Sequence, residues 1–300
     1  MAIKNKLEDY QISDDDALCS FDVKSLFTSV PPDMAISCLE QALSSSNDWK
    51  QRTTLDKDDL ICLTRICLQS TVFKYNDQIY KQVHGTPMGS SISVTLAELT
   101  MQSIENEIFD NSPIEIKLWK RYVDDIITII PKTRIDEFHN FINSINTNIQ
   151  FEKELENHNT LPFLDLQIIR KAEGSLKFQV YRKPTHTNRY LDADSNCPMT
   201  HKTSVIRSLV DRAFNLCSSE YLESEIEFIK STLISNGYKS RQINQIIRKK
   251  RNSINSSNLS PQTNNNDPQQ KYISVPYIKG TYEGMGRLLK QKKNIILASK

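Results

Sequence analysis

The sequence predicts an α+β fold in which a domain of interspersed strands and helices precedes a helical region. Its 300 residues suffice for about two structural units. Apolar residues recur with the periods of strands and of helices up to Arg182, whereas from Thr203 onward only the helical period remains. Hydrophobic residues at 38% and charged residues at 25% indicate a globular chain with a core rather than a disordered one.

Helices are predicted wherever apolar residues recur at a period of about 3.6 residues. Pro31-Pro32 precedes the first helix and Asp56 caps the second, because proline and aspartate are typical of helix starts. The predicted helices cover residues 33–44, 56–67, 91–109, 135–149, 204–217, 219–236 and 240–251. Gly237 is expected to end the sixth of them as a C-cap.

Strands are predicted where the apolar pattern is strongly β-like. Asn76-Asp77 lies between two alternating runs and indicates a hairpin, and a second hairpin carries Asp124-Asp125 at its tip. A third pair is expected to turn near Glu173-Gly174. The predicted strands are a short run ending near residue 23, two arms within 71–82, two arms within 116–130, and the segments 161–170 and 176–182.

Composition and charge exclude several classes. No apolar stretch approaches about 18 residues and the N-terminus has no apolar signal core, so no membrane partner is expected. The 7 glycines form no GxGxxG or GxxxxGK motif, which excludes a Rossmann dinucleotide site and a P-loop. Net charge is −9 over residues 1–238 and +11 over residues 239–300. The basic end is therefore either a polyanion contact or a solvated tail.

Asp124 and Asp125 are adjacent carboxylates between two apolar strands, where unneutralised charge would be costly to bury. Asp22 ends another apolar run, and a neighbouring strand could bring it opposite that pair. Three carboxylates at strand ends provide the hard oxygen ligands of a two-Mg²⁺ site. A turn cap or an exposed charge is the alternative interpretation of each aspartate.

Several motifs, in order, resemble those of reverse transcriptases. FDVKSLF at 21–27, HGTPMGSSIS at 84–93 and YVDD at 122–125 look like the A, B and C motifs of that family, and LPFLD follows at 161–165. More narrowly, SFDVKSLFTSVP, WKRYVDD, LPFLDLQIIR, YRKPTHTNRYL and VPYIKG resemble Penelope-like retroelement reverse transcriptases, a group akin to telomerase. The resemblance implies a reverse-transcriptase palm, an antiparallel sheet with helices packed on one face, followed by a helical thumb.

The resemblance also implies roles for single residues. Asp22, Asp124 and Asp125 would be catalytic and would hold two Mg²⁺ ions, for which Mn²⁺ can substitute. Phe27 would exclude a 2′-hydroxyl and so select dNTPs, although a core phenylalanine is the alternative. The remaining implied contacts are His84, Gly85 and Gly89 with the nucleotide, and Tyr122, Leu164, Asp165, Arg182 and Lys183 with primer or template.

The implied domain organisation is a partial palm at 1–170 and a primer-grip strand with a helical thumb at 171–252, where a helix-turn-helix-like module is an equal description. An Asn/Ser/Gln-rich linker follows at 253–270, because that composition has no apolar period. Residues 271–300 are expected to be a connector toward a GIY-YIG endonuclease found in full-length relatives. Because few residues precede Asp22, the fingers are expected to be missing and the chain to be a fragment.

Two other constellations are disfavoured. His186, Cys197, His201 and Cys217 lack the spacing of a zinc site. Lys153 is more typical of a surface lysine than of a proton donor to pyrophosphate.

The sequence therefore predicts an RNA-directed DNA polymerase of a retrotransposable element, which uses an RNA template, a DNA primer and dNTPs. A catalytically inactive truncated copy that only binds nucleic acid is the alternative. Nuclear localisation follows from the resemblance, and the basic run at 248–251 is compatible with an import signal.

Overall fold

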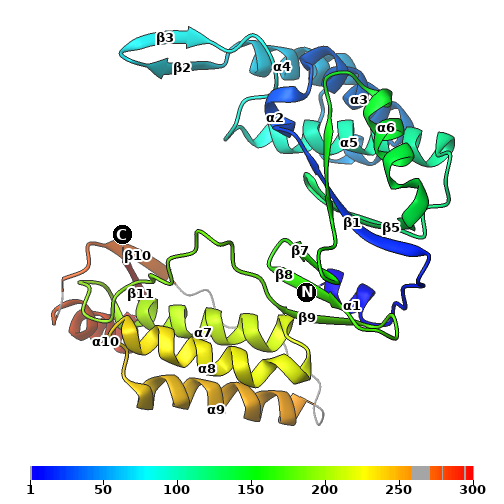
Figure 1. Ribbon diagram of the computed structural model, residues 1–300. Coiled ribbons are helices and arrows are strands. Elements are labelled where there is room, and N and C mark those ends of the chain that lie inside the picture. Colours follow the sequence, from blue (N-terminus) through cyan, green and yellow to red (C-terminus); the bar gives the residue numbers. More distant parts are fainter. Residues whose placement is uncertain (1, 258–270, 279, 294, 300) are drawn as a thin grey trace. The chain divides into compact units, whose positions relative to one another are not determined.

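A computed structural model describes residues 2–257, 271–278, 280–293 and 295–299 (Figure 1). The chain forms two compact units. We call residues 6–164 and 168–176 the sheet unit, and residues 1–5, 165–167 and those from 177 onward the helical unit. In the part of the chain that the structure describes, no helix is long and apolar enough to cross a membrane.

The sheet unit is built on a four-stranded antiparallel sheet of order β4-β5-β1-β6. Its strands are β1 (Asp16–Val23), β4 (Leu118–Tyr122), β5 (Asp125–Pro131) and β6 (Phe151–Leu155). The helices of this unit are α2 (Leu26–Ser29), α3 (Pro32–Ser45), α4 (Lys57–Gln69), α5 (Ser91–Asn111) and α6 (Ile135–Ile145), with short 3-10 turns η1 (Asp48–Gln51) and η2 (Lys132–Arg134). Helix α1 (Ala2–Leu7) is divided between the two units after residue 5.

Helices α3, α5 and α6 pack on one face of this sheet. Cys19, Phe21 and Val23 alternate along β1 and belong to the same apolar core as residues of these helices. Phe21 is 1% exposed and meets the ring of Phe138 on α6 edge-on, with the ring centroids 5.9 Å apart. Burying side chains of this size stabilises the fold by about 1.5–3 kcal/mol each. The predicted α+β fold with helices on one face of an antiparallel sheet is confirmed.

A helix cap and a hairpin turn form at the positions where local sequence motifs predict them. The Asp56 side chain accepts a hydrogen bond from the Asp59 N–H, and the Asp59 side chain accepts one from the Asp56 N–H, so a capping box starts α4. Asn76 and Asp77 adopt φ of 46° and 61° in the turn of the hairpin β2 (Val72–Tyr75) and β3 (Gln78–Lys81). Figure 1 shows this hairpin projecting from the end of α4.

Some element boundaries differ from those predicted. The segment 161–170 is not one strand but two, β7 (Thr160–Phe163) and β8 (Leu166–Arg170), because Leu164 turns the chain with a φ of 52°. These strands form a three-stranded sheet with β9 (Leu176–Val180). Helix α6 ends at Ile145 rather than at residue 149, and β6 was not predicted because FEKEL carries mostly charged residues.

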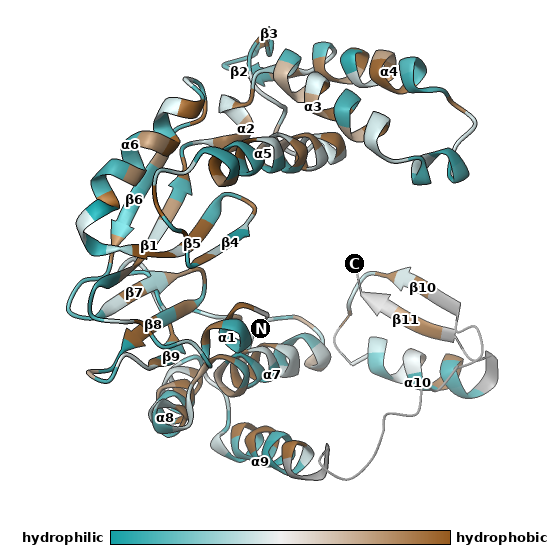
Figure 2. Cartoon of the chain, turned by 90° about the vertical axis from the view of Figure 1, so that its right-hand side faces the viewer, coloured by the Kyte–Doolittle hydropathy of each residue, from teal (hydrophilic) through white to brown (hydrophobic). Residues whose placement is uncertain are grey.

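The helical unit packs three helices, α7 (Met199–Leu216), α8 (Ser219–Ser235) and α9 (Ser240–Ser257), around a core of their apolar residues. Figure 2 shows the brown, hydrophobic segments that alternate with polar ones along these helices. Gly237 has a φ of 83° after α8, as its C-cap role requires. Helix α9 continues to Ser257, so residues 253–257 are helical where a linker was predicted, and residues 258–270 lie outside the described part.

The segment predicted as a connector contains a β-α-β unit. Strand β10 (Lys271–Val275) pairs in parallel with β11 (Ile295–Ser299), and α10 (Tyr282–Lys293) lies between them in sequence. A parallel pair needs such a crossover.

Candidate active site

Two of the predicted catalytic carboxylates, Asp22 and Asp125, are paired at one end of the strands of the four-stranded sheet. In the register of the strands Asp22 pairs with Asp125, and Asp125 pairs with Tyr122 on its other side. Directly paired residues of an antiparallel sheet point to the same face. This row lies on the face opposite the helices, because the intervening Phe21 and Ile126 belong to the helix-covered core.

The row continues onto β6, where Glu152 pairs with Asp22. Glu152 is exposed and forms an ion pair of 2.9 Å with Lys24, which follows β1. Three consecutive strands therefore contribute one carboxylate each. Sequence reasoning missed Glu152 because β6 itself was not predicted, and no local signal in its charged sequence identifies the pairing.

Asp124 lies in the two-residue turn between β4 and β5, next to a strained residue. Val123, the first residue of this turn, has a φ of 60°. A left-handed backbone costs an L-residue about 1–2 kcal/mol, and β-branched residues adopt it rarely. The Val23 N–H donates to the Asp124 carbonyl at 3.1 Å, so the turn is tied to the end of β1 next to Asp22.

A buried arginine, Arg121, donates a hydrogen bond to the Val123 carbonyl in this turn. Arg121 on β4 is 8% exposed and forms ion pairs with Glu98 at 2.7 Å and Glu105 at 2.9 Å, both on α5. Burial acts to lower the pKa of Arg121, but hydrogen bonds to the two glutamates outweigh it and raise that pKa above its ordinary value. The hydrogen bond from Arg121 lowers the pKa of Glu98. Sequence reasoning missed this cluster, although a basic residue alternating with Trp119 on the helix-facing side of β4 is a usable signal.

The glycine-containing loop before α5 contacts the segment that carries Phe27. Thr86 donates through its N–H at 2.6 Å and its hydroxyl at 3.0 Å to the Phe27 carbonyl. A Cβ on Gly85 would lie 2.6 Å from the Thr28 backbone, whereas one on Gly89 would meet nothing within 4 Å. Gly85 is thus required by backbone packing, and Gly89 borders open space.

The other residues predicted to contact the nucleotide, primer or template lie on several different segments of the chain. Phe27 is half-buried against the core, which leaves the alternative of a core phenylalanine open, and His84 is exposed. Leu164 and Asp165 form the turn between β7 and β8, and Asp165 pairs with Arg212 of α7 at 2.8 Å. Leu164 belongs to the sheet unit and Asp165 to the helical unit.

Two further predicted contacts, Arg182 and Lys183, also belong to the helical unit. Arg182 is paired with Glu225 and stands over the ring of Phe228, 4.1 Å from its centroid. Burial acts to lower the pKa of Arg182, but its hydrogen bond with Glu225 raises it. Its charge therefore holds α8 in place, whereas Lys183 is exposed.

A divalent cation fits the carboxylate row by the chemistry of its donors. Asp22 and Asp125 present hard oxygen ligands, and like charges that are directly opposite repel each other, which a cation would relieve. Asp124 follows in the adjoining turn between β4 and β5. Within the described residues, no three His, Cys, Asp or Glu side chains converge into a group that could hold a metal ion. The carboxylates of Asp22 and Asp125 are therefore neighbours on adjacent strands, and within the described residues they do not form a group of three that surrounds one ion.

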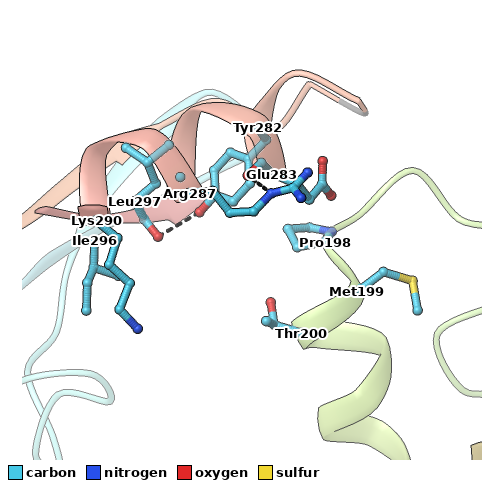
Figure 3. Close-up of a pocket in the computed structure, with 10 residues that line it drawn as sticks. Pro198, Met199, Thr200, Tyr282, Glu283, Arg287, Lys290, Ile296 and Leu297 are labelled. Carbon is cyan, nitrogen blue, oxygen red and sulfur yellow. Dashed lines mark hydrogen bonds between the residues drawn. The ribbon is translucent and has the colours of Figure 1, made fainter. Parts of the chain in front are cut away.

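A separate pocket lies in the helical unit, between the start of α7 and the segment of α10 and β11 (Figure 3). Pro198, Met199 and Thr200 line one side, and Tyr282 and Arg287 line the other. The Tyr282 hydroxyl donates to the Leu297 carbonyl at 2.8 Å, which ties α10 to β11. None of the predicted site residues lines this pocket.

Two family profiles match parts of the chain. A family profile described as reverse transcriptase (RNA-dependent DNA polymerase) matches residues 5–156, and one described as animal helix-turn-helix domain matches residues 189–248. No curated protein matches the chain.

Among solved structures, telomerase from Candida albicans, in complex with a TWJ fragment of telomeric RNA, is similar with a TM-score of 0.52 and 13% identity over 78% of this chain. The Sicinivirus 3Dpol RNA-dependent RNA polymerase has a TM-score of 0.47 and 12% identity over 82% of this chain. The chain spans 42% of the telomerase chain and 54% of the viral one. At this identity the first likeness shows the fold alone.

Proposed function

Because the chain belongs to the reverse transcriptase family, we propose that it is an RNA-directed DNA polymerase that joins a dNTP to a primer 3′-hydroxyl. The observation that carries this proposal is the pairing of Asp22 with Asp125 on adjacent strands, with Asp124 in the turn beside them. A polymerase needs such carboxylates because its substrate and leaving group are polyanionic.

The roles of the residues follow from their places. Asp22, Asp124 and Asp125 would hold two Mg²⁺ ions, or Mn²⁺ in their stead. When bound, the ions would lower the pKa of the primer hydroxyl and neutralise charge on the triphosphate. The open space beside Gly89 leaves room for the substrate. Phe27, fixed through its carbonyl by Thr86, would restrict the sugar to a deoxyribose.

The finer assignment is a Penelope-like retroelement, in which α7–α9 act as the thumb on the primer–template duplex. The motifs WKRYVDD and YRKPTHTNRYL support that assignment. A GIY-YIG endonuclease and a nuclear site of action belong to the same proposal, since such an element is copied into chromosomal DNA.

Primer extension on a homopolymer RNA template, with Mg²⁺ or Mn²⁺, tests the proposal. The parent chain is compared with Asp124→Asn/Asp125→Asn and with a matched control, Asp48→Asn/Asp58→Asn, which removes two exposed aspartates outside the row. Extension by the parent and the control alone is the expected result. Equal extension by the Asp124/Asp125 variant, shown to be folded by circular dichroism, would refute the role of the row.

A nucleic-acid-binding chain without turnover is the second candidate, and the helix-turn-helix match at 189–248 favours it. Absence of extension by the parent, combined with duplex binding that weakens as salt rises, would support this candidate instead.

A further inference from the structure

Arg121 uses every donor that an arginine has. Its Nε donates to Glu105 at 2.9 Å, and its Nη2 donates to Glu98 at 2.9 Å and to Glu105 at 3.0 Å. Its Nη1 donates to Glu98 at 2.7 Å and to the Val123 carbonyl at 3.1 Å. A guanidinium has five N–H groups, so all five are engaged. Four bonds fix the side chain to α5, and the fifth reaches the turn that carries Asp124.

The two glutamates make α5 a rigid support for this arginine. Glu98 and Glu105 are two helical turns apart and therefore share one face of the helix. Trp119 adds a hydrogen bond of 2.7 Å from its indole N–H to Glu105. Ala97, Met101 and Ile104 bury the helix between them in the core, at 2% exposure or less. The position of Arg121 is thus set by side chains of a packed helix, of which Glu105 is 13% exposed and Glu98 44% exposed.

The fifth hydrogen bond is accepted by Val123, the residue of the turn with the strained backbone. In this turn Val123 alone has a positive φ, at the position where a two-residue hairpin loop of type II′ takes glycine. The next residue, Asp124, accepts the Val23 N–H. A continuous path of hydrogen bonds and backbone therefore runs from α5 through Arg121 and Val123 to the two strand ends that bear the aspartates.

We propose that Arg121 is a positioning residue that holds Val123 in its left-handed conformation, and thereby presents Asp124 and Asp125 beside Asp22. Arg121 lies on the helix-covered face and contacts no substrate in this scheme. Because α5 begins at Ser91, two residues after Gly89, the same helix supports the nucleotide loop and the catalytic turn. The catalytic consequence rests on the proposed function, whereas the positioning itself does not.

Hydrogen exchange of the Val23 amide, followed by NMR without metal or nucleotide, tests the positioning directly. In Arg121→Lys the ammonium cannot reproduce the fork of five donors. The loss of one charge-assisted hydrogen bond should accelerate Val23 exchange by about tenfold or more. Adding Val123→Gly should restore most of the protection, because glycine adopts a positive φ without support.

Arg170→Lys is the matched control. Arg170 is also buried, at 11% exposure, pairs with a buried Glu156 at 2.6 Å and donates to the Asp16 carbonyl at the opposite end of β1. This control should leave Val23 exchange near the parent value. If Arg121→Lys fails to fold, Glu98→Gln, which keeps the Glu105 bonds, should give a smaller acceleration confined to the same amide.

Three outcomes would overturn the proposal: unchanged Val23 exchange in Arg121→Lys, an equal acceleration at all β1 amides, or no rescue by Val123→Gly. The second and third would make Arg121 only a staple between α5 and the sheet. Primer extension adds the catalytic readout, in which kcat should fall about tenfold or more while KM for the dNTP changes little. Failure of the parent to extend a primer would refute the polymerase but not the positioning, which the exchange data decide.

Discussion

Gly85→Ala offers a quantitative test of why the loop before α5 contains glycine. Gly85 has a φ of +73°, and an added Cβ would lie 2.6 Å from both Cα and O of Thr28. The left-handed backbone costs alanine about 1–2 kcal/mol, and the crowding of rigid backbone atoms adds about 1–3 kcal/mol. We therefore expect the free energy of unfolding of the sheet unit to fall by about 2–5 kcal/mol.

Gly89→Ala is the control within the same motif. Gly89 has a φ of +88°, yet nothing lies within 4 Å of an added Cβ. Only the conformational cost of about 1–2 kcal/mol applies to stability. The added methyl group enters the space that the proposed function gives to the substrate. The free energy of dNTP binding should therefore change more in this variant than the free energy of unfolding does.

Urea unfolding followed by tryptophan fluorescence measures the difference. Both tryptophans, Trp49 and Trp119, belong to the sheet unit, so the signal reports the unit that contains the loop. A larger shift of the midpoint in Gly85→Ala, with an unchanged slope, is expected. Equal losses in the two variants would refute the claim that the approach to Thr28 requires glycine.

Three further measurements test other parts of the structure. Phe27→Ala should reduce the preference for dNTP over NTP in kcat/KM by about tenfold or more, and an unchanged ratio would remove its gate role. Burial acts to raise the pKa of Asp16, but hydrogen bonds from Lys117 (2.7 Å) and Ser13, together with the charges of Lys117 and Lys132, outweigh burial and hold the pKa below the ordinary 3.8. The stabilisation is therefore complete above pH 3.8 and is lost as pH falls through the lower folded pKa, so Asp16→Asn should flatten the acid limb of a stability–pH curve. Burial raises the pKa of the Cys19 thiol to about 12, so a thiol reagent at pH about 8 should label exposed Cys62 rapidly and Cys19 only after unfolding.

Local chemistry explains which elements the sequence could predict. The hairpin at Asn76-Asp77 and the capped start of α4 are set by residues within one turn of each other, so their signals are complete in the sequence. The β7–β8 turn at Leu164 could not be predicted, because leucine is not a turn former and its φ of 52° is imposed by the surrounding structure. Strand β6 places Phe151 in the core, but its sequence FEKEL is mostly charged, and its pairing is specified by its partner β1.

Some residues of the candidate site could likewise be predicted from the sequence, and others could not. The proximity of Asp22 to Asp125 follows from two strand ends that antiparallel pairing can join, and the structure bears out their pairing. Glu152 enters the row only through the β1–β6 register. The two glutamates that hold Arg121 are long-range partners on α5, 23 and 16 residues away, so sequence could flag the arginine but not its support.

Because side chains alternate between the two faces of the sheet, the proposed catalytic carboxylates and the arginine that positions their turn lie on opposite faces. Asp22, Asp125 and Glu152 occupy one face, and Arg121 occupies the other, because neighbouring positions of a strand point in opposite directions. A substitution in the open row changes the charge that a cation or a phosphate meets, and leaves the core intact. A substitution of Arg121 changes no charge on the open face but removes the hydrogen bond that supports Val123. The two kinds of variant should therefore differ in kind: the first in metal dependence, and the second in protection of the Val23 amide.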